Sequence, residues 1–336
     1  MSDLSVNSIL DVSGGATTTI NGFTPTVSNM AGRNKIINGG MGIDQRNAGA
    51  SVTPSSGSSY TLDRWKNYNS QASKLSFQQN AGSVTPPAGF TNYIGCTSLS
   101  AFSVGASDEF DLYQLIEGYN MADLSWGTAD AKTVTLSFWV RSSLTGTFGG
   151  SIQNSGGSRN YPFSYTISSA NTWEQKSITV AGDTTGTWLK TNGVGISLLF
   201  SLGAGSSVIG TAGAWTNTSL VGVTEQVNLV GTSGATFYIT GVQLEEGSVA
   251  TPFEHRQYGQ ELALCQRYYE FSTNAGSLIF NANYSGVSFI VTKRATPTIT
   301  ITPVSGTTSA INTDISGFYA TNTTLASAAW TATSEL

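Results

Sequence analysis

The chain has 336 residues, a net charge of −5 and a pI near 4.9, and only 10% of its residues are charged. That length allows two or three small domains, while the acidic balance without clustered Lys and Arg excludes a nucleic-acid partner. No apolar run reaches the roughly 18 residues of a membrane span, and the first residues lack a signal peptide pattern, so we expect synthesis in the cytoplasm without membrane insertion.

The composition favours β structure. Hydrophobic residues make up 39% and aromatic residues 10%, and the low charge is offset by 38 glycines with abundant Ser, Thr and Asn. These residues suit short strands joined by tight turns and are poor in helix interiors. We therefore predict an all-β protein. Cys96 and Cys265 are too few for a disulfide framework and too far apart in sequence for a metal pair, so we expect both to be small buried apolar residues.

Residues 1–33 are mainly polar and have too few apolar side chains to form a core of their own. The segment is either a flexible tail or an arm that adds strands to a neighbouring subunit, and we favour the arm. The apolar residues that would dock it are Val6, Ile9, Leu10, Ile20 and Phe23.

Residues 36–43 predict a first strand interrupted at Asn38-Gly39-Gly40, and Trp65 predicts a core anchor. Several charges lie close to these positions in a chain that uses few. We expect Arg–Asp ion pairs that tie this part of the chain to the sheet, with a polar ligand pocket as the alternative. The residues are Asp44, Arg46, Asp63, Arg64 and Lys66.

Strands are expected at 74–78 and 93–99, and within 107–124, a segment that also suits a helix. That last segment holds a group of acids, for which we favour solvated loop positions. The alternative is a structural calcium ion, although the dense spacing of a calcium-binding loop is missing. The acids are Asp108, Glu109, Asp111, Glu117 and Asp123.

Residues 132–141 alternate so that Val134, Leu136, Phe138 and Val140 face the core. Trp139 faces the other way, where it could stack on a sugar ring or be covered by a neighbouring loop or subunit. Further strands are expected at 161–167, 177–180, 196–200 and 222–229.

Trp188 and Trp215 lie in loops of Gly, Ser and Thr. An exposed indole among small hydroxyl side chains is typical of a glycan platform, because it offers an apolar face beside hydrogen-bonding groups. Packing against a partner subunit is the alternative for both residues.

Residues 237–246 predict a strand with Tyr238, Thr240, Val242 and Leu244 on one face, and with Gly241 permitting a bulge. A short helix is expected over 260–269, with Leu262, Cys265 and Tyr269 forming its apolar stripe. Strands at 277–280, 287–293, 298–302 and 328–333 would build a second, smaller domain.

Three motifs carry a family resemblance. They are NKIINGGMGIDQRNAGASVT…YTLDRWK (34–66), GVQLEEGSVATPFEHR…GQELALCQRYY (241–269) and VTKRATPTITI…WTATSEL (291–336). In this order they resemble bacteriophage fibre and appendage proteins, cyanophage-like in type, with a jelly roll similar to carbohydrate-binding modules. The strand pattern F-x-L-x-Q-x-I-E at 110–117 is similar to those modules as well.

The resemblance implies a virion attachment arm at 1–33, a jelly-roll β-sandwich at 34–256 and a small β-rich domain with one short helix at 257–336. It further implies a homotrimeric virion protein that contacts other tail or capsid proteins through the arm. Host-surface polysaccharide would bind at Trp188, Trp215 and Trp139.

Two other functions remain open from the sequence. One is a purely structural capsid decoration or neck/tail connector, and the other is a polysaccharide depolymerase, since two carboxylates can meet from distant positions. His255 is the single histidine, so a Ser-His-Asp triad could be assembled only by assuming that His255 belongs to it, and the sequence contains no Cys/His metal set. We therefore expect no enzyme, cofactor, metal ion or catalytic residue.

Overall fold

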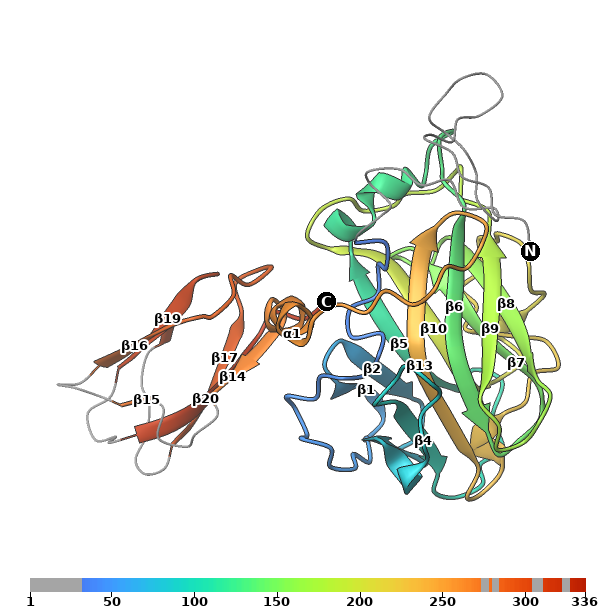
Figure 1. Cartoon of the computed structure of the whole chain (residues 1–336), viewed down its shortest axis with the longest axis horizontal. Coiled ribbons are helices and arrows are strands. Elements are labelled where there is room, and N and C mark those ends of the chain that lie inside the picture. The colour runs from blue at the N-terminus through green and yellow to red at the C-terminus, as the bar shows by residue number, and fades with distance from the viewer. Residues whose placement is uncertain (1–31, 273–277, 280–283, 304–310, 322–326) are drawn as a thin grey trace, which may run out of the picture.

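The computed structural model describes residues 32–272, 278–279, 284–303, 311–321 and 327–336 (Figure 1). A large β-sandwich and a smaller β-rich lobe lie side by side, with the single α-helix of the described residues at their junction. The predicted all-β jelly-roll fold with a small C-terminal β-rich part is confirmed. Val6, Ile9, Leu10, Ile20 and Phe23 lie outside the described residues.

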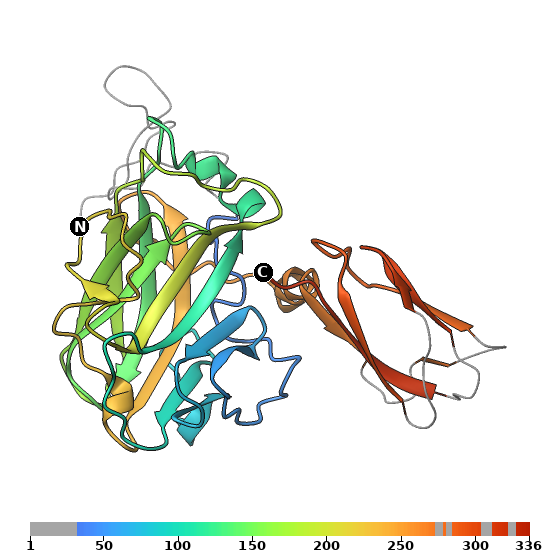
Figure 2. The same ribbon diagram turned by 180° about the vertical axis from the view of Figure 1, so that it is seen from behind.

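Two antiparallel sheets form the sandwich. One contains, in spatial order, β1 (Gly57–Leu62), β2 (Trp65–Asn69), β5 (Glu109–Glu117), β10 (Val194–Ala204), β7 (Gly146–Gln153) and β8 (Asn160–Ile167). The other contains β3 (Leu75–Gln79), β4 (Ile94–Ser98), β13 (Thr236–Glu246), β6 (Val134–Ser142) and β9 (Glu174–Val180). Short 3-10 turns lie at Ala81–Ser83, Gly118–Asn120, Ala122–Leu124 and Leu229–Gly231. Figure 2 views the molecule with the six-stranded sheet in front.

The core lies between the two sheets. Val134, Leu136, Phe138 and Val140 all point into it with 0% of their surface exposed, as the alternation in β6 predicted. Phe138 meets Phe200 of the opposite sheet at 5.0 Å between ring centroids. Trp65 is fully buried in the same cluster, which confirms its role as a core anchor. Cys96 and Cys265 are buried free thiols, as expected.

The predicted faces of β13 are wrong beyond Gly241. The pairing of β13 with β6 shifts between Thr240 and Gln243, and Gly241 has a φ of 63°. This bulge adds one residue, so the alternation restarts in the opposite phase. Val242 and Leu244 therefore join the core, while Tyr238 packs in a separate cluster on the outer side of the sheet.

Residues 36–43 do not form the predicted strand. The Asn38 side chain replaces a neighbouring strand: its Nδ2 donates to the carbonyls of Ile43 at 2.8 Å and Asp63 at 2.9 Å, and its Oδ1 accepts from the Ile43 N–H at 3.0 Å. The segment therefore buries Ile36 and Met41 without a β ladder.

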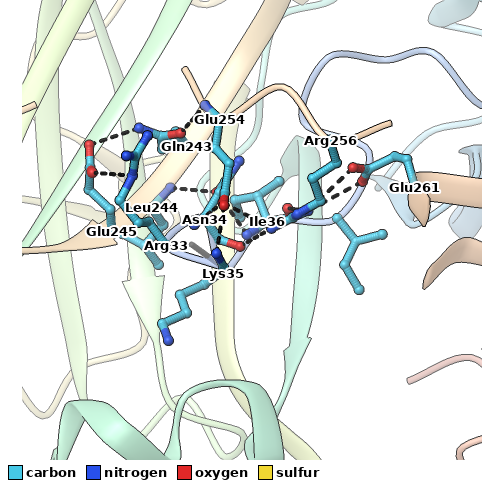
Figure 3. A network of polar contacts seen from close by, with 12 residues as sticks. Arg33, Asn34, Lys35, Ile36, Gln243, Leu244, Glu245, Glu254, Arg256 and Glu261 are labelled. Carbon is cyan, nitrogen blue, oxygen red and sulfur yellow. Dashed lines mark hydrogen bonds and ion pairs between the residues drawn. The ribbon is translucent and has the colours of Figure 1, made fainter. Parts of the chain in front are cut away.

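A polar network joins residues 34–36 to β13 and to the segment that follows β13 (Figure 3). The Glu254 carboxylate accepts from the Asn34 N–H at 2.8 Å, and Asn34 Nδ2 donates to the Val242 carbonyl at 3.1 Å. Arg256 donates to the carbonyls of Asn34 and Ile36. Two of the three sequence motifs therefore meet in space.

The smaller lobe begins with α1 (Tyr258–Gln266), which ends three residues earlier than predicted because Tyr269 starts a strand. One sheet contains β14 (Tyr269–Phe271), β20 (Ser327–Thr333), β15 (Leu278–Ile279) and β17 (Thr298–Pro303), and the other contains β16 (Tyr284–Ser288), β19 (Gly317–Thr321) and β18 (Ile311–Thr313). Phe289, Phe318 and Trp330 form the centre of its core.

Ion pairs join the two lobes. Arg46 pairs with Glu335 at 2.8 Å, and the buried guanidinium of Arg64 pairs with the same carboxylate. The expected Arg–Asp bridges are therefore replaced by pairs with a residue that is distant in sequence. Asp63 instead accepts hydrogen bonds from the backbone and side chain of Gln45, both at 2.6 Å.

Within the described residues, we find no helix with the length and apolar character needed to cross a bilayer.

Candidate functional site

The outer face of the six-stranded sheet is partly covered by residues 205–228, which include β11 (Ile209–Gly210) and β12 (Gly222–Val223). Val221 and Ile209 pack on Leu199 of β10, and Gln226 Nε2 donates to Ser201 Oγ at 2.8 Å. The covering segment reaches β8 as well, since Asn160 Nδ2 donates to the Leu220 carbonyl at 2.6 Å.

A cleft of about 220 Å³ opens on this face beside the covering segment. Its walls come from β2, β5, β7 and β10 and from the covering segment itself. The lining residues are Tyr68, Glu109, Asp111, Tyr113, Gln153, Ser197, Leu199, Ser219 and Val221.

The alternation of β5 aims two side chains into the cleft. Phe110 and Leu112 are buried in the main core, so Asp111 and Tyr113 point to the outer face. In the antiparallel register, Asp111 lies opposite Tyr68 of β2, and Tyr113 lies opposite Leu199 of β10. Cross-strand neighbours of this kind are close enough to act on one ligand.

Asp111 is the most unusual group in the cleft. Only 1% of its surface is exposed, and its Oδ1 has no hydrogen-bond partner among the described residues. Burial, with the nearby Glu109 carboxylate, raises the pKa of Asp111 well above its usual value. Buried polar atoms are nearly always paired, so this carboxyl is suited to a ligand hydroxyl.

Tyr113 supplies an aromatic surface beside that carboxyl. Its ring is half-buried against Leu199 and Val221, and its hydroxyl lies 3.0 Å from Ser58 Oγ. Burial raises the pKa of Tyr113, so the phenol stays neutral and can both donate and accept. Tyr68, also half-buried, lies opposite Asp111 on the neighbouring strand β2. Aromatic faces next to carboxyl, amide and hydroxyl groups can hold a polyhydroxylated ring.

Trp188 is not exposed, contrary to the sequence-based expectation. Only 6% of its surface is accessible, its ring lies 4.7 Å from that of Trp126, and its Nε1 donates to Asp183 at 2.9 Å. Asp183 is held in turn by Arg159, with hydrogen bonds of 2.5 and 2.9 Å. The Arg159–Asp183 ion pair thus holds the carboxylate that accepts from the indole, and the indole packs against the sandwich core.

Trp215 and Trp139 are half-buried. Trp215 lies 5.6 Å from Trp188 between ring centroids and donates to the Ala181 carbonyl at 2.8 Å. Trp139 lies on the outer face of the five-stranded sheet, paired in register with Thr240 and Gln175. The structure thus brings Trp188 and Trp215 together, and Trp139 belongs to the opposite sheet; none of the three lines the cleft.

The predicted solvated acids include two that are buried. Asp111 and Glu117 each have 1% of their surface exposed, because both lie on β5 rather than in a loop. Glu117 accepts hydrogen bonds from Arg267 at 2.8 Å and from the Tyr268 hydroxyl at 2.7 Å. Within the described ranges, no three His, Cys, Asp or Glu side chains are grouped so as to hold a metal ion.

The sequence contained one signal for the cleft. Once 110–117 is read as a strand with Phe110 and Leu112 inward, Asp111 and Tyr113 must point outward together. Tyr68, Gln153 and Ser197 could not be assigned in this way, because only the strand order places them beside β5.

Comparison with known proteins finds no matching family profile and no matching curated protein. Among solved structures, a sugar-binding protein described as putative from Bacteroides thetaiotaomicron aligns with a TM-score of 0.37 at 12% identity, over 64% of this chain and 100% of that one. The module TmCBM61, solved with β-1,4-galactotriose, aligns with a TM-score of 0.31 at 12% identity, over 64% of this chain and 99% of its own.

A phage protein is among these similar structures. The enzymatically active domain of bacteriophage CBA120 tailspike protein 4 aligns with a TM-score of 0.35 at 12% identity. The match covers 63% of this chain but only 21% of the tailspike chain. Likenesses at this level do not assign a function.

Proposed function

We propose that this protein binds carbohydrate without cleaving it, in the cleft over β2, β5 and β10, as part of a bacteriophage tail fibre or appendage. Asp111 carries the binding proposal: it is buried, lines the cleft beside Tyr113, and has a carboxyl oxygen with no partner among the described residues. A sugar ring would pack on Tyr113 and place a hydroxyl against Asp111.

Polar groups around the cleft fit the same ligand class. Gln153 and Ser197 lie on adjacent strands, and Glu109 lies at the end of β5. Amide, hydroxyl and carboxyl groups can each bond to sugar hydroxyls. The cleft lining contains no Lys or Arg, so it suits a neutral glycan better than a phosphorylated one.

The virion assignment has separate support. The motifs at 34–66 and 241–269 resemble phage fibre proteins and are joined through Asn34, Glu254 and Arg256. We infer a homotrimer located in the virion, bound to other tail or capsid proteins through residues 1–33, that uses the cleft on host-surface polysaccharide. A capsid decoration or neck/tail connector role is the structural alternative.

The experiment compares wild type, Tyr113→Ala and Tyr258→Ala on a printed array of bacterial polysaccharides and defined oligosaccharides. Tyr258 is 69% exposed and outside the cleft, so its substitution is a matched control. We expect wild type and Tyr258→Ala to bind the same glycans equally well, and Tyr113→Ala to bind them at least about tenfold more weakly. If wild type binds no glycan on the array, the binding function is overturned. If Tyr113→Ala binds every glycan as strongly as wild type does, the assignment of binding to the cleft is overturned.

Two further measurements test the rest of the proposal. Light scattering should give the mass of three chains, and a monomer would contradict the fibre assignment. The polysaccharide recovered after binding should show no new reducing ends. If new reducing ends appear, the protein is a depolymerase, and the proposal of binding without cleavage is overturned.

A further inference from the structure

We propose that the smaller lobe carries a second carbohydrate-contacting surface, centred on Tyr319. It lies on the outer face of the sheet formed by β16, β19 and β18, and it does not depend on the cleft of the sandwich. A hollow of about 360 Å³ is present there. Its lining consists of Gly286, Val287, Ser288, Asn312, Thr313, Asp314, Ser316, Gly317, Phe318 and Tyr319.

Tyr319 is 64% exposed, although it occupies the middle of β19. The alternation in this strand buries Phe318 and Ala320 in the core of the lobe and turns Tyr319 outward. A large aromatic side chain exposed to this degree has a free face on which a ligand can stack.

Gly286 sets the position of that ring. It is the direct register partner of Tyr319, and a Cβ built on Gly286 would lie 3.3 Å from two carbons of the tyrosine ring. The ring thus lies against the bare backbone of β16, because a side chain at 286 would displace it. One face of the ring is supported by the sheet, and the other faces solvent.

The groups around the ring are planar polar side chains and hydroxyls. Asn312 is the register partner of Tyr319 on β18 and is exposed, as is Ser288 on β16. Asp314 follows β18 and accepts from the Ser316 N–H and hydroxyl at 2.6 Å and from the Gly317 N–H at 3.1 Å. These bonds lower the pKa of Asp314, so it is a fixed, charged acceptor.

The other oxygen of that carboxylate is free to accept from a ligand. All three bonds to Asp314 fall on Oδ1, and no hydrogen bond to Oδ2 is found among the described residues. An aromatic face with an amide, a carboxylate and hydroxyls beside it fits a sugar ring. The lining includes no Lys or Arg, which disfavours a phosphate ligand.

Four variants on the same glycan array test this site. Tyr319→Ala should weaken binding to a subset of glycans by about tenfold, which corresponds to about 1.4 kcal/mol. Tyr319→Phe keeps the ring and should keep that subset. Gly286→Val should displace the ring and reproduce the loss, while Tyr258→Ala, which does not line the hollow, should behave as wild type.

Tyr113→Ala separates this inference from the cleft. If both surfaces bind, Tyr113→Ala and Tyr319→Ala each weaken binding and the double variant loses it. Identical arrays for wild type and Tyr319→Ala would overturn the second site and leave the cleft intact. A lower oligomeric mass for folded Tyr319→Ala would also overturn it, because Tyr319 would then be a subunit contact.

Discussion

The Leu244 N–H donates a hydrogen bond of 3.1 Å to Asn34 Oδ1 across 210 positions of sequence, and the Lys35 N–H donates to the Leu244 carbonyl at 2.9 Å. Asn34 is 4% exposed, and its Oδ1 also accepts from the Ile36 N–H at 2.9 Å. One amide side chain thus bonds to buried backbone groups from the first and the last part of the sandwich sequence, at Ile36 and Leu244. The start of the described chain is therefore fixed to β13, the central strand of the five-stranded sheet.

Tyr113→Ala should weaken glycan binding by at least about tenfold, or about 1.4 kcal/mol, because it removes the ring that supports the sugar. Titration calorimetry with the best array ligand gives the change in Kd. Tyr113→Phe retains the ring and should lose less. Equal affinities for wild type and Tyr113→Ala would refute a role of the ring.

Asp111→Asn should make the protein more stable at pH 8 and yet weaken glycan binding. The raised pKa means that the folded protein retains a proton that the unfolded chain releases, so stability falls as the pH rises above the usual carboxyl pKa of about 4. Asparagine cannot ionise and avoids this loss.

Thermal melts of both proteins from pH 4 to pH 8 measure the effect of Asp111→Asn. The melting temperatures should converge at the acidic end and separate by several degrees at pH 8. A difference that does not vary with pH would show that ionisation of Asp111 is not its source.

Trp188→Ala should destabilise the protein by about 3–5 kcal/mol, because it empties a buried site. It also leaves Asp183 without the indole donor. Urea unfolding measures the loss, and Tyr258→Ala should change stability by less than about 0.5 kcal/mol as the exposed control. A stable Trp188→Ala protein that has lost only glycan binding would instead support the platform expected from the sequence.

Glu335→Gln should cost about 3–5 kcal/mol, because it leaves the buried Arg64 guanidinium without its carboxylate. Glu246→Gln is the matched control. Its pair with Lys132 has side chains 42% and 35% exposed, so its loss should cost at most about 1 kcal/mol. Equal losses in urea unfolding would show that burial of the Arg64 pair is unimportant.

Gly241→Ala should destabilise the sandwich by at least about 2 kcal/mol, from a left-handed φ combined with overpacking. A Cβ at 241 would lie 2.6 Å from the Phe90 ring. The control is Gly234→Ala. Gly234 also has a positive φ, of 77°, but a Cβ added there would have no atom within 4 Å. It should therefore lose only about 1 kcal/mol, and a similar loss for both variants would exclude the Phe90 contact as a cause.

Residue type and alternation by themselves determined most strands of the sandwich, although not the strand expected at 36–43. The low charge and the abundant Gly, Ser and Thr predicted an all-β chain, and the alternation in 132–141 identified four core residues of β6. These predictions succeed because a half-buried strand sorts its side chains with a period of two wherever it is placed. A different spacing, of three and four between apolar residues, predicted the short helix near Cys265.

Only the tertiary structure decided which side chains meet. The bulge at Gly241 reversed the faces of β13, Glu335 took the place of the expected aspartates beside Arg64, and Trp188 turned inward behind Asp183. The cleft depends on β2, β5 and β10 being neighbours and on residues 205–228 covering one side. Such contacts follow from sheet order and loop packing over long sequence separations, which local periodicity does not encode.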